Sequence, residues 1–193
     1  MISLSVWFLF YLLPIGVAGG IAKLFPTRGN EPISRDAFVI HVALLISILG
    51  SQYALFTAGR AFPWSAEDPF IFLYAAGIVF SFLLLRSLGL WYALSALLQQ
   101  ACMLSMAFVL YEAFPLWGVV LLVVPIYTLA HLLKVRYAWS RMALFFAWGA
   151  IIVLLFPLLP SVWLFAALHT IAGAVLIRFG VLYPRSVIPK GFI

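Results

Sequence analysis

Charged side chains are scarce in this sequence. Lysine, arginine, aspartate and glutamate make up 8% of the 193 residues, whereas hydrophobic types make up 67%. A soluble globular domain carries about a quarter charged residues, because water must solvate its surface. The mean hydropathy is +1.21. This composition excludes an ordinary water-soluble fold and predicts a chain that lies within a lipid bilayer.

Cysteine is almost absent as well. Cys102 is the one cysteine in the chain, so the sequence excludes an intrachain disulfide and a metal site of the multiple-cysteine type. The residue stands inside an apolar stretch, where free cysteine behaves as a small hydrophobic side chain. We therefore expect Cys102 to be buried and structural.

Acidic residues are the scarcer of the two charge types, with 5 against 11 basic residues and a net charge of +6. The basic residues stand singly between apolar stretches, whereas nucleic-acid-binding surfaces cluster them. We expect no nucleic-acid partner. Lys23 and Arg28 follow the first apolar stretch instead of preceding it, which is the reverse of a secretory signal and predicts a retained first helix.

Long apolar stretches fill most of the chain. About 20 apolar residues are needed to cross roughly 30 Å of hydrocarbon as a helix. Seven stretches approach that length: 4–24, 37–58, 69–85, 90–111, 115–133, 141–158 and 161–180. Turn-forming residues separate them at 26–32, 63–69, 86–89 and 114–115, while 156–160 is either a turn or a helix kink. The sequence predicts an all-α transmembrane helix bundle of about seven spans in a single domain, residues 1–193.

The basic residues predict how this bundle is oriented. If successive connections alternate between the two sides of the membrane, ten of the 11 basic residues fall on one side. The other side receives Arg60 together with Glu67, Asp68 and Glu112. Because basic loops stay in the cytoplasm, we expect the N-terminus outside and the C-terminus in the cytoplasm. The expected location is the bacterial plasma (inner) membrane, with the lipid bilayer as the first partner.

Polar side chains inside the apolar stretches are the candidate functional residues, because an unpaired polar group in hydrocarbon costs several kcal/mol. They are Gln99, Gln100, His131 and His169, with His41 nearer an interface. Two interpretations remain open: hydrogen bonds that hold the helices together, or one site shared by three helices. No carboxylate lies well within a span, and the motifs of serine hydrolases, phosphate loops and zinc proteases are absent.

Three short motifs follow one another between Leu97 and Ile177. They are Gln99-Gln100-x-x-x-Leu104, Tyr127-x-x-x-His131 and His169-x-x-x-Gly173. Their order and spacing resemble those of the motifs in the core of the CPBP family (CAAX proteases and bacteriocin-processing proteins, also called Abi). The similar region covers approximately residues 90–180. Those glutamic-type intramembrane proteases carry Glu-Glu-x-x-x-Arg, Phe-x-x-x-His and His-x-x-x-Asn at these places.

The resemblance implies that Gln99, Gln100, His131 and His169 occupy the family's catalytic positions. Tyr127 and Gly173 would support them; in addition, the Tyr127 hydroxyl lies one helical turn before His131, where it can orient the imidazole.

The residues that depart from the family pattern stand at positions that carry out the family's catalysis. Glutamine cannot accept a proton, so neither residue of the Gln99-Gln100 pair can be the base that activates water. Leu104 replaces the arginine and Gly173 the asparagine, which favours natural divergence over a deliberate exchange of glutamate for glutamine. The leading hypothesis is a catalytically impaired homologue, a pseudoenzyme that binds or assembles with other membrane-protein subunits.

Two alternatives use the histidines differently. In an active intramembrane protease, His131 would be the base and His169 the donor to the oxyanion. In a subunit of a bioenergetic complex, the two histidines would be axial ligands of haem or another pigment. Neither the leading hypothesis nor the protease alternative requires a cofactor or a metal ion.

Overall fold

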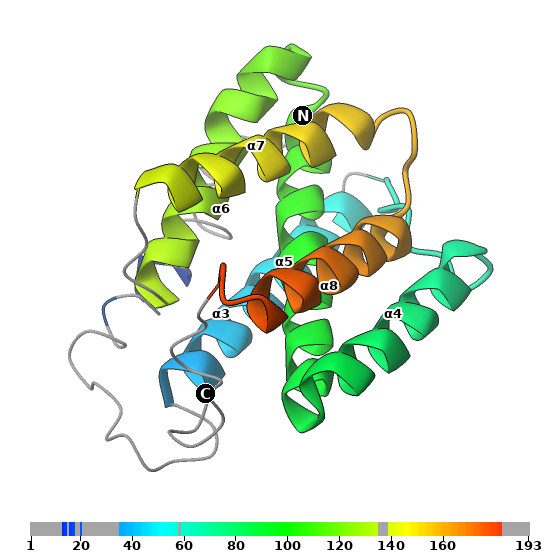
Figure 1. Cartoon of the computed structure of the whole chain (residues 1–193). Helices are drawn as coiled ribbons and strands as arrows, with labels where there is room; N and C mark the ends of the chain where they lie inside the picture. Colours follow the sequence, from blue (N-terminus) through cyan, green and yellow to red (C-terminus); the bar gives the residue numbers. More distant parts are fainter. Residues whose placement is uncertain are drawn as a thin grey trace.

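The computed structural model of the chain is all-α (Figure 1). It describes residues 35–57, 59–134 and 139–182, and isolated helical positions at 13, 14, 16, 17 and 20. Within these ranges, side chains are described except at 35–38 and 132–140. The expected first span lies outside the described residues except at those isolated positions, and so do the loop 26–32 and the segment 183–193.

Six helices follow one another from Arg35 to Arg178: α3 (Arg35–Thr57), α4 (Phe70–Leu85), α5 (Ser87–Leu110), α6 (Leu116–Lys134), α7 (Trp139–Leu155) and α8 (Val162–Arg178). Each coincides with one of the expected apolar stretches, so the prediction of an all-α fold is confirmed. Helix α5 and the Val39–Thr57 part of α3 are long and apolar enough to cross a membrane. The other four helices are apolar but shorter.

The reversal between α4 and α5 is tighter than the turn expected at 86–89. Arg86 alone separates the two helices, with a positive φ of 54°. Gly89 permits this approach, because a Cβ at that position would overlap the carbonyl group of Ser81. The Ser81 hydroxyl donates to the carbonyl oxygen of Gly89 at 3.1 Å. Helix α5 therefore starts three residues earlier than its apolar stretch indicates.

The segment 156–160 is a turn and not a kink. Helix α7 ends at Leu155, and α8 begins at Val162 after a serine cap. The Ser161 hydroxyl accepts a hydrogen bond from the Leu164 backbone N–H at 3.0 Å, which satisfies one of the unpaired donors at the helix start.

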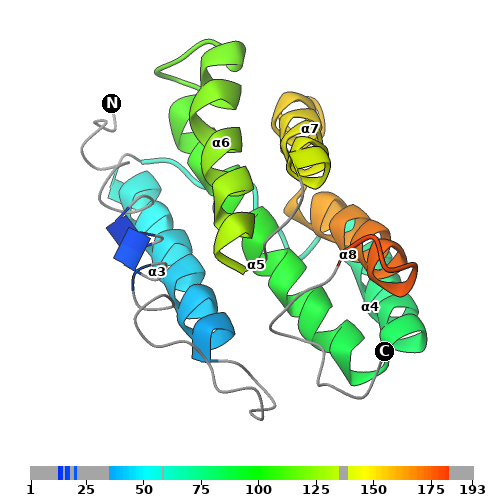
Figure 2. The same ribbon diagram turned by 60° about the vertical axis from the view of Figure 1, so that its left-hand side comes forward.

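Helix α5 stands at the centre of the bundle. It contacts α3, α4, α6 and α8, while α8 also lies along α4 and α7 pairs with α6 (Figures 1 and 2). The glycine of the small-residue patch 75–77 faces α8, where a Cβ at Gly77 would meet Ile171 at 3.4 Å. Small residues at this contact let the two helix backbones approach closely.

The connections between helices gather in two places. At one end of the bundle, Arg60 Nε lies 3.0 Å from Glu112 Oε1, which joins the α3–α4 connection to the end of α5. The indole N–H of Trp163, at the start of α8, donates to the carbonyl oxygen of Ser65 at 2.9 Å. Elsewhere, Met142 of α7 packs with Ile177 of α8 beside Leu85 at the end of α4. The connections that follow α3, α5 and α7 therefore lie together at one end of the bundle. The end of α4 and the start of α7 lie together elsewhere.

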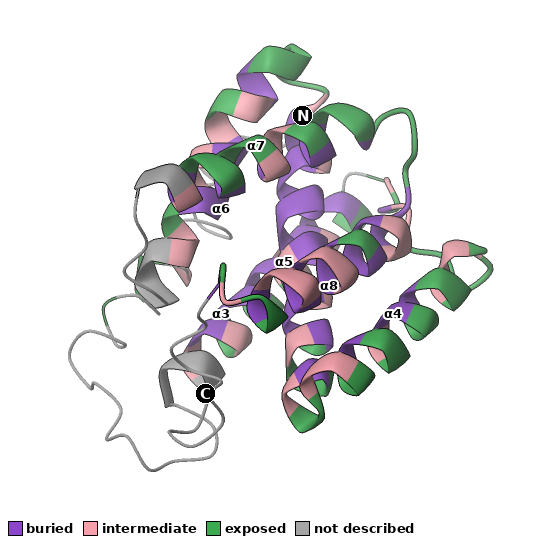
Figure 3. Ribbon diagram, viewed as in Figure 1, coloured by how far each residue is buried: buried purple, intermediate pink, exposed green. Residues whose placement is uncertain are grey.

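The outside of the bundle is unusually apolar for a soluble protein, while the interior is mostly apolar with some buried polar side chains. Large apolar side chains cover the outside, with Phe56 and Phe72 exposed at 80% and 78%, and the outward face of α4 is exposed along its length (Figure 3). Soluble monomers rarely expose contiguous apolar patches of more than a few hundred Å². The buried polar residues are Ser47, Ser51, Ser81, Ser95, Gln100, Ser105, Thr128, Ser161, His169 and Thr170.

Candidate functional site

Gln100 and His169 form the centre of the candidate site. Gln100 is fully buried on α5, and its Nε2 donates to Nδ1 of His169 on α8 at 2.5 Å. Because Nδ1 accepts this bond, a neutral His169 carries its proton on Nε2. The structure therefore brings together two residues of the expected set that lie 69 positions apart in the chain.

Gln99 is directed elsewhere. Its Nε2 donates to the hydroxyl of Ser95 at 2.8 Å, one turn earlier on the same helix, and its side chain is only partly buried. Neighbouring residues of an α-helix point about 100° apart. Only Gln100 of the pair contacts α8 through a hydrogen bond described by the structure.

Tyr92 fills the space beside Gly173, and the sequence analysis did not identify it. A Cβ at position 173 would overlap the hydroxyl oxygen and the adjoining ring carbons of Tyr92. The Tyr92 ring also lies edge-on to His169, with 6.0 Å between centroids. The position at which the CPBP pattern carries an asparagine is therefore occupied by a phenol from α5. Tyr92 precedes Gln100 by eight residues, the spacing of one helix face, and this was the available signal.

Tyr127 contributes to the same site from α6. Its hydroxyl lies near Gln100 and Tyr92 but makes no hydrogen bond in the structure. Gln100 Oε1 and Trp148 Nε1, on two residues next to His169, are also buried without a hydrogen-bond partner in the structure. The Trp148 ring lies 6.4 Å from that of His169. Four helices, α5 to α8, thus supply one buried polar cluster.

His131 is held differently from the expected arrangement. Its Nδ1 donates to the backbone carbonyl oxygen of Tyr127 at 2.8 Å, and not to the hydroxyl of that residue. The imidazole stacks on Phe145 of α7 at 4.2 Å and meets the Tyr127 ring edge-on at 4.6 Å. The structure connects His131 to the cluster through Tyr127.

The other positions singled out in the sequence lie in the core or on α3. Leu104, which stands where the CPBP pattern has an arginine, is fully buried in the apolar core around α5. Cys102 is a free, buried thiol, as expected. His41 is half-buried on α3. Within the described part of the chain, no group of three or more histidine, cysteine, aspartate or glutamate side chains is arranged to hold a metal ion.

The chemistry of the cluster is that of neutral hydrogen-bonding groups. It offers an amide, two phenols, an indole N–H and an imidazole, without a carboxylate among the residues named above. Such groups hold helices together or bind a neutral polar molecule. No protein-family model matches the chain, and no curated protein or solved structure is similar to it.

Proposed function

We propose that the chain is a multi-pass membrane protein with seven spans, of which the six helices α3 to α8 are the last six. The large apolar side chains exposed on the outside of the bundle support a lipid surrounding. The grouping of Arg60, Ser65, Glu112 and Trp163 at one end of the bundle agrees with a common, non-cytoplasmic side for those connections. Helices shorter than the bilayer is thick are accommodated by local thinning of the bilayer.

Within that membrane protein, we propose a catalytically impaired, CPBP-like binding or assembly subunit. The observation that carries this proposal is the combination of the Gln100–His169 hydrogen bond with the Tyr92 phenol in the space of a side chain at 173. An amide is not a base, so Gln100 cannot take a proton from water, although its Oε1 has no hydrogen-bond partner in the structure. The phenol takes the room in which an asparagine would reach an oxyanion.

The test is an assay for peptidase activity together with purification from native membranes. We expect the wild-type chain to co-purify with a membrane partner at a fixed stoichiometry and to cleave no peptide. Gln99→Glu with Gln100→Glu is also expected to be inactive, because Leu104 and Gly173 remain and Tyr92 still fills the site. Cleavage by folded wild-type protein would contradict the proposal.

A second candidate is an intramembrane hydrolase that uses His131 and His169. It is favoured by the unpaired polar atoms around His169, since such groups suit a held water molecule. In that case, His131→Ala should abolish cleavage while the protein remains folded by circular dichroism. Unchanged cleavage in that variant would rule out His131 as the base.

A further inference from the structure

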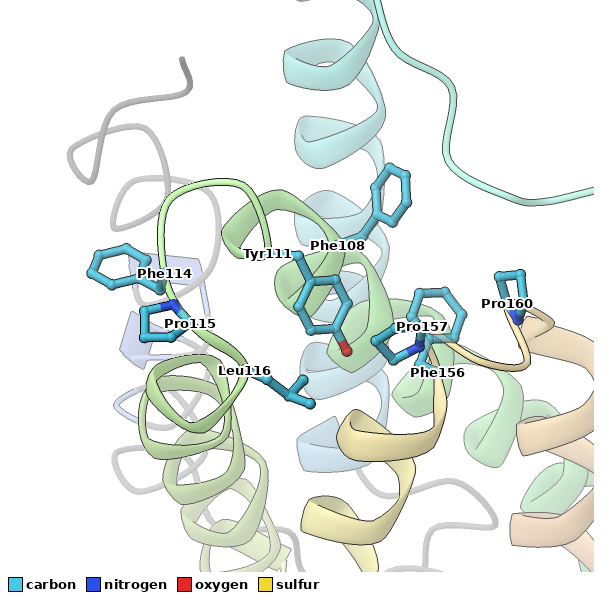
Figure 4. Close-up of a pocket in the computed structure, with 8 residues that line it drawn as sticks. All are labelled: Phe108, Tyr111, Phe114, Pro115, Leu116, Phe156, Pro157 and Pro160. Atoms are coloured by element: carbon cyan, nitrogen blue, oxygen red, sulfur yellow. The ribbon is translucent and has the colours of Figure 1, made fainter.

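A pocket opens at the end of the bundle, away from the polar cluster's hydrogen bonds. It lies between the α5–α6 and α7–α8 connections and has a volume of about 450 Å³ (Figure 4). Its lining residues come from the ends of α5 and α7, the start of α6 and the turn before α8: Phe108, Tyr111, Phe114, Pro115, Leu116, Phe156, Pro157 and Pro160. The volume is within the range of small-molecule binding sites.

The walls of this pocket accept only an apolar occupant. Aromatic rings, prolines and one leucine line it, and Tyr111 carries the one side-chain polar atom. That hydroxyl already donates to the carbonyl oxygen of Val153 at 2.6 Å. Leu116 points from the start of α6 toward Tyr111 and Pro157 (Figure 4). A hydrocarbon chain fits such walls, whereas a polar ligand would lose its hydrogen bonds to water without replacement.

A pair of opposite charges lies next to the pocket. The Arg60 guanidinium is 4.6 Å from the ring centroid of Phe108, one of the lining residues. Its Nε contacts Glu112, while its Nη1 is buried without a hydrogen-bond partner. The Glu112 side chain is 55% exposed. The site therefore combines a guanidinium, on a side chain that is 22% exposed, with an accessible carboxylate beside an apolar pocket.

We propose that this pocket binds one acyl chain of a bilayer phospholipid whose zwitterionic headgroup carries a phosphate and an amine. The Arg60 guanidinium donates to the phosphate, a pairing that guanidinium geometry favours, and Glu112 accepts from the amine. Lipid tails gain little by leaving other lipid tails, so the headgroup contacts determine which lipid binds. The inference rests on the proposed membrane location.

Native mass spectrometry of the purified full chain tests the proposal, with phosphatidylethanolamine and phosphatidylglycerol as probes. We expect the wild type to retain one phosphatidylethanolamine in preference to phosphatidylglycerol. Leu116→Trp fills the pocket from a position that is 40% exposed, and it should weaken retention about tenfold, equivalent to ~1.4 kcal/mol. Leu158→Trp is the matched control, because Leu158 is 75% exposed and does not line the pocket.

The headgroup contacts are tested separately. Glu112→Gln should remove the preference for the amine-bearing lipid while an acyl chain is still retained. Equal retention in wild type and Leu116→Trp, or equal loss in Leu158→Trp, overturns the pocket assignment. If the wild type is extracted from membranes by alkaline carbonate, the membrane location itself is wrong; if it resists extraction but retains no lipid, only the lipid site is wrong.

Discussion

Gly173 has no side chain, and the Tyr92 phenol occupies the space that a Cβ at position 173 would need. We expect Gly173→Ala to destabilise the protein by about 1–3 kcal/mol, since the new methyl group must displace the Tyr92 phenol. Thermal unfolding in detergent measures this. Gly77→Ala is the control, because a Cβ there makes an ordinary contact with Ile171 at 3.4 Å. If Tyr92→Ala does not reduce the cost of Gly173→Ala, the two residues are not coupled.

The Gln100–His169 hydrogen bond should contribute measurably to stability. Gln100→Leu and His169→Leu each leave a buried polar partner unsatisfied, which costs about 1–3 kcal/mol. The double variant should lose less than the sum of the two single changes, by roughly 0.6–1.7 kcal/mol as for other interhelical bonds in membranes. Unfolding in denaturing detergent measures the three variants. Strict additivity would show that the 2.5 Å contact carries no coupling energy.

The sequence predicted some of these residues and missed others for a physical reason. Gln100 and His169 stand out because amides and imidazoles are costly in hydrocarbon, so a partner for each was expected. Tyr92 did not stand out, because a tyrosine near a span end is a common interfacial residue. Its eight-residue spacing from Gln100 places both residues on one face of α5, but that spacing does not predict the contact with Gly173 of α8.

At the scale of helices, the α4–α5 reversal depends on a glycine in the first turn of α5. Gly89→Ala would place a methyl group against the Ser81 backbone, which cannot move without breaking α4. We expect a loss of at least about 1–3 kcal/mol in stability and of the hydrogen bond from the Ser81 hydroxyl. Gly118→Ala in α6 is the control, because a Cβ there meets its nearest neighbour at 3.5 Å. Equal stability of the two variants would contradict the assigned contact.

The helices themselves were largely predictable, since long apolar stretches separated by turn residues leave little choice of secondary structure. The exceptions are at their ends. Helix α5 begins at Ser87, within residues whose glycine and arginine predicted a turn. Pro125 lies inside α6, although proline removes one backbone hydrogen bond of a helix and usually bends or ends it. Local turn signals were outweighed here by packing between helices.

At the scale of the molecule, the proposed orientation predicts which residues can be labelled from each side. Cysteine introduced at Glu67 should react with an impermeant maleimide in intact cells. Cysteine introduced at Arg86 should react only after the membrane is permeabilised. The native Cys102 is buried, so the unmodified chain is the background control. Labelling of both positions from the same side would disprove the alternation of the connections.

The contact between Ser65 and Trp163 has a consequence for biosynthesis. The two residues are 98 positions apart, so at typical rates of translation the ribosome delivers the tryptophan about 5–20 s after the serine. Until then, the Ser65 carbonyl oxygen on the α3–α4 connection lacks the Trp163 indole N–H as a hydrogen-bond donor. This end of the bundle is therefore completed only after α8 has been made, and a nascent chain arrested before α8 would leave the α3–α4 connection without this contact.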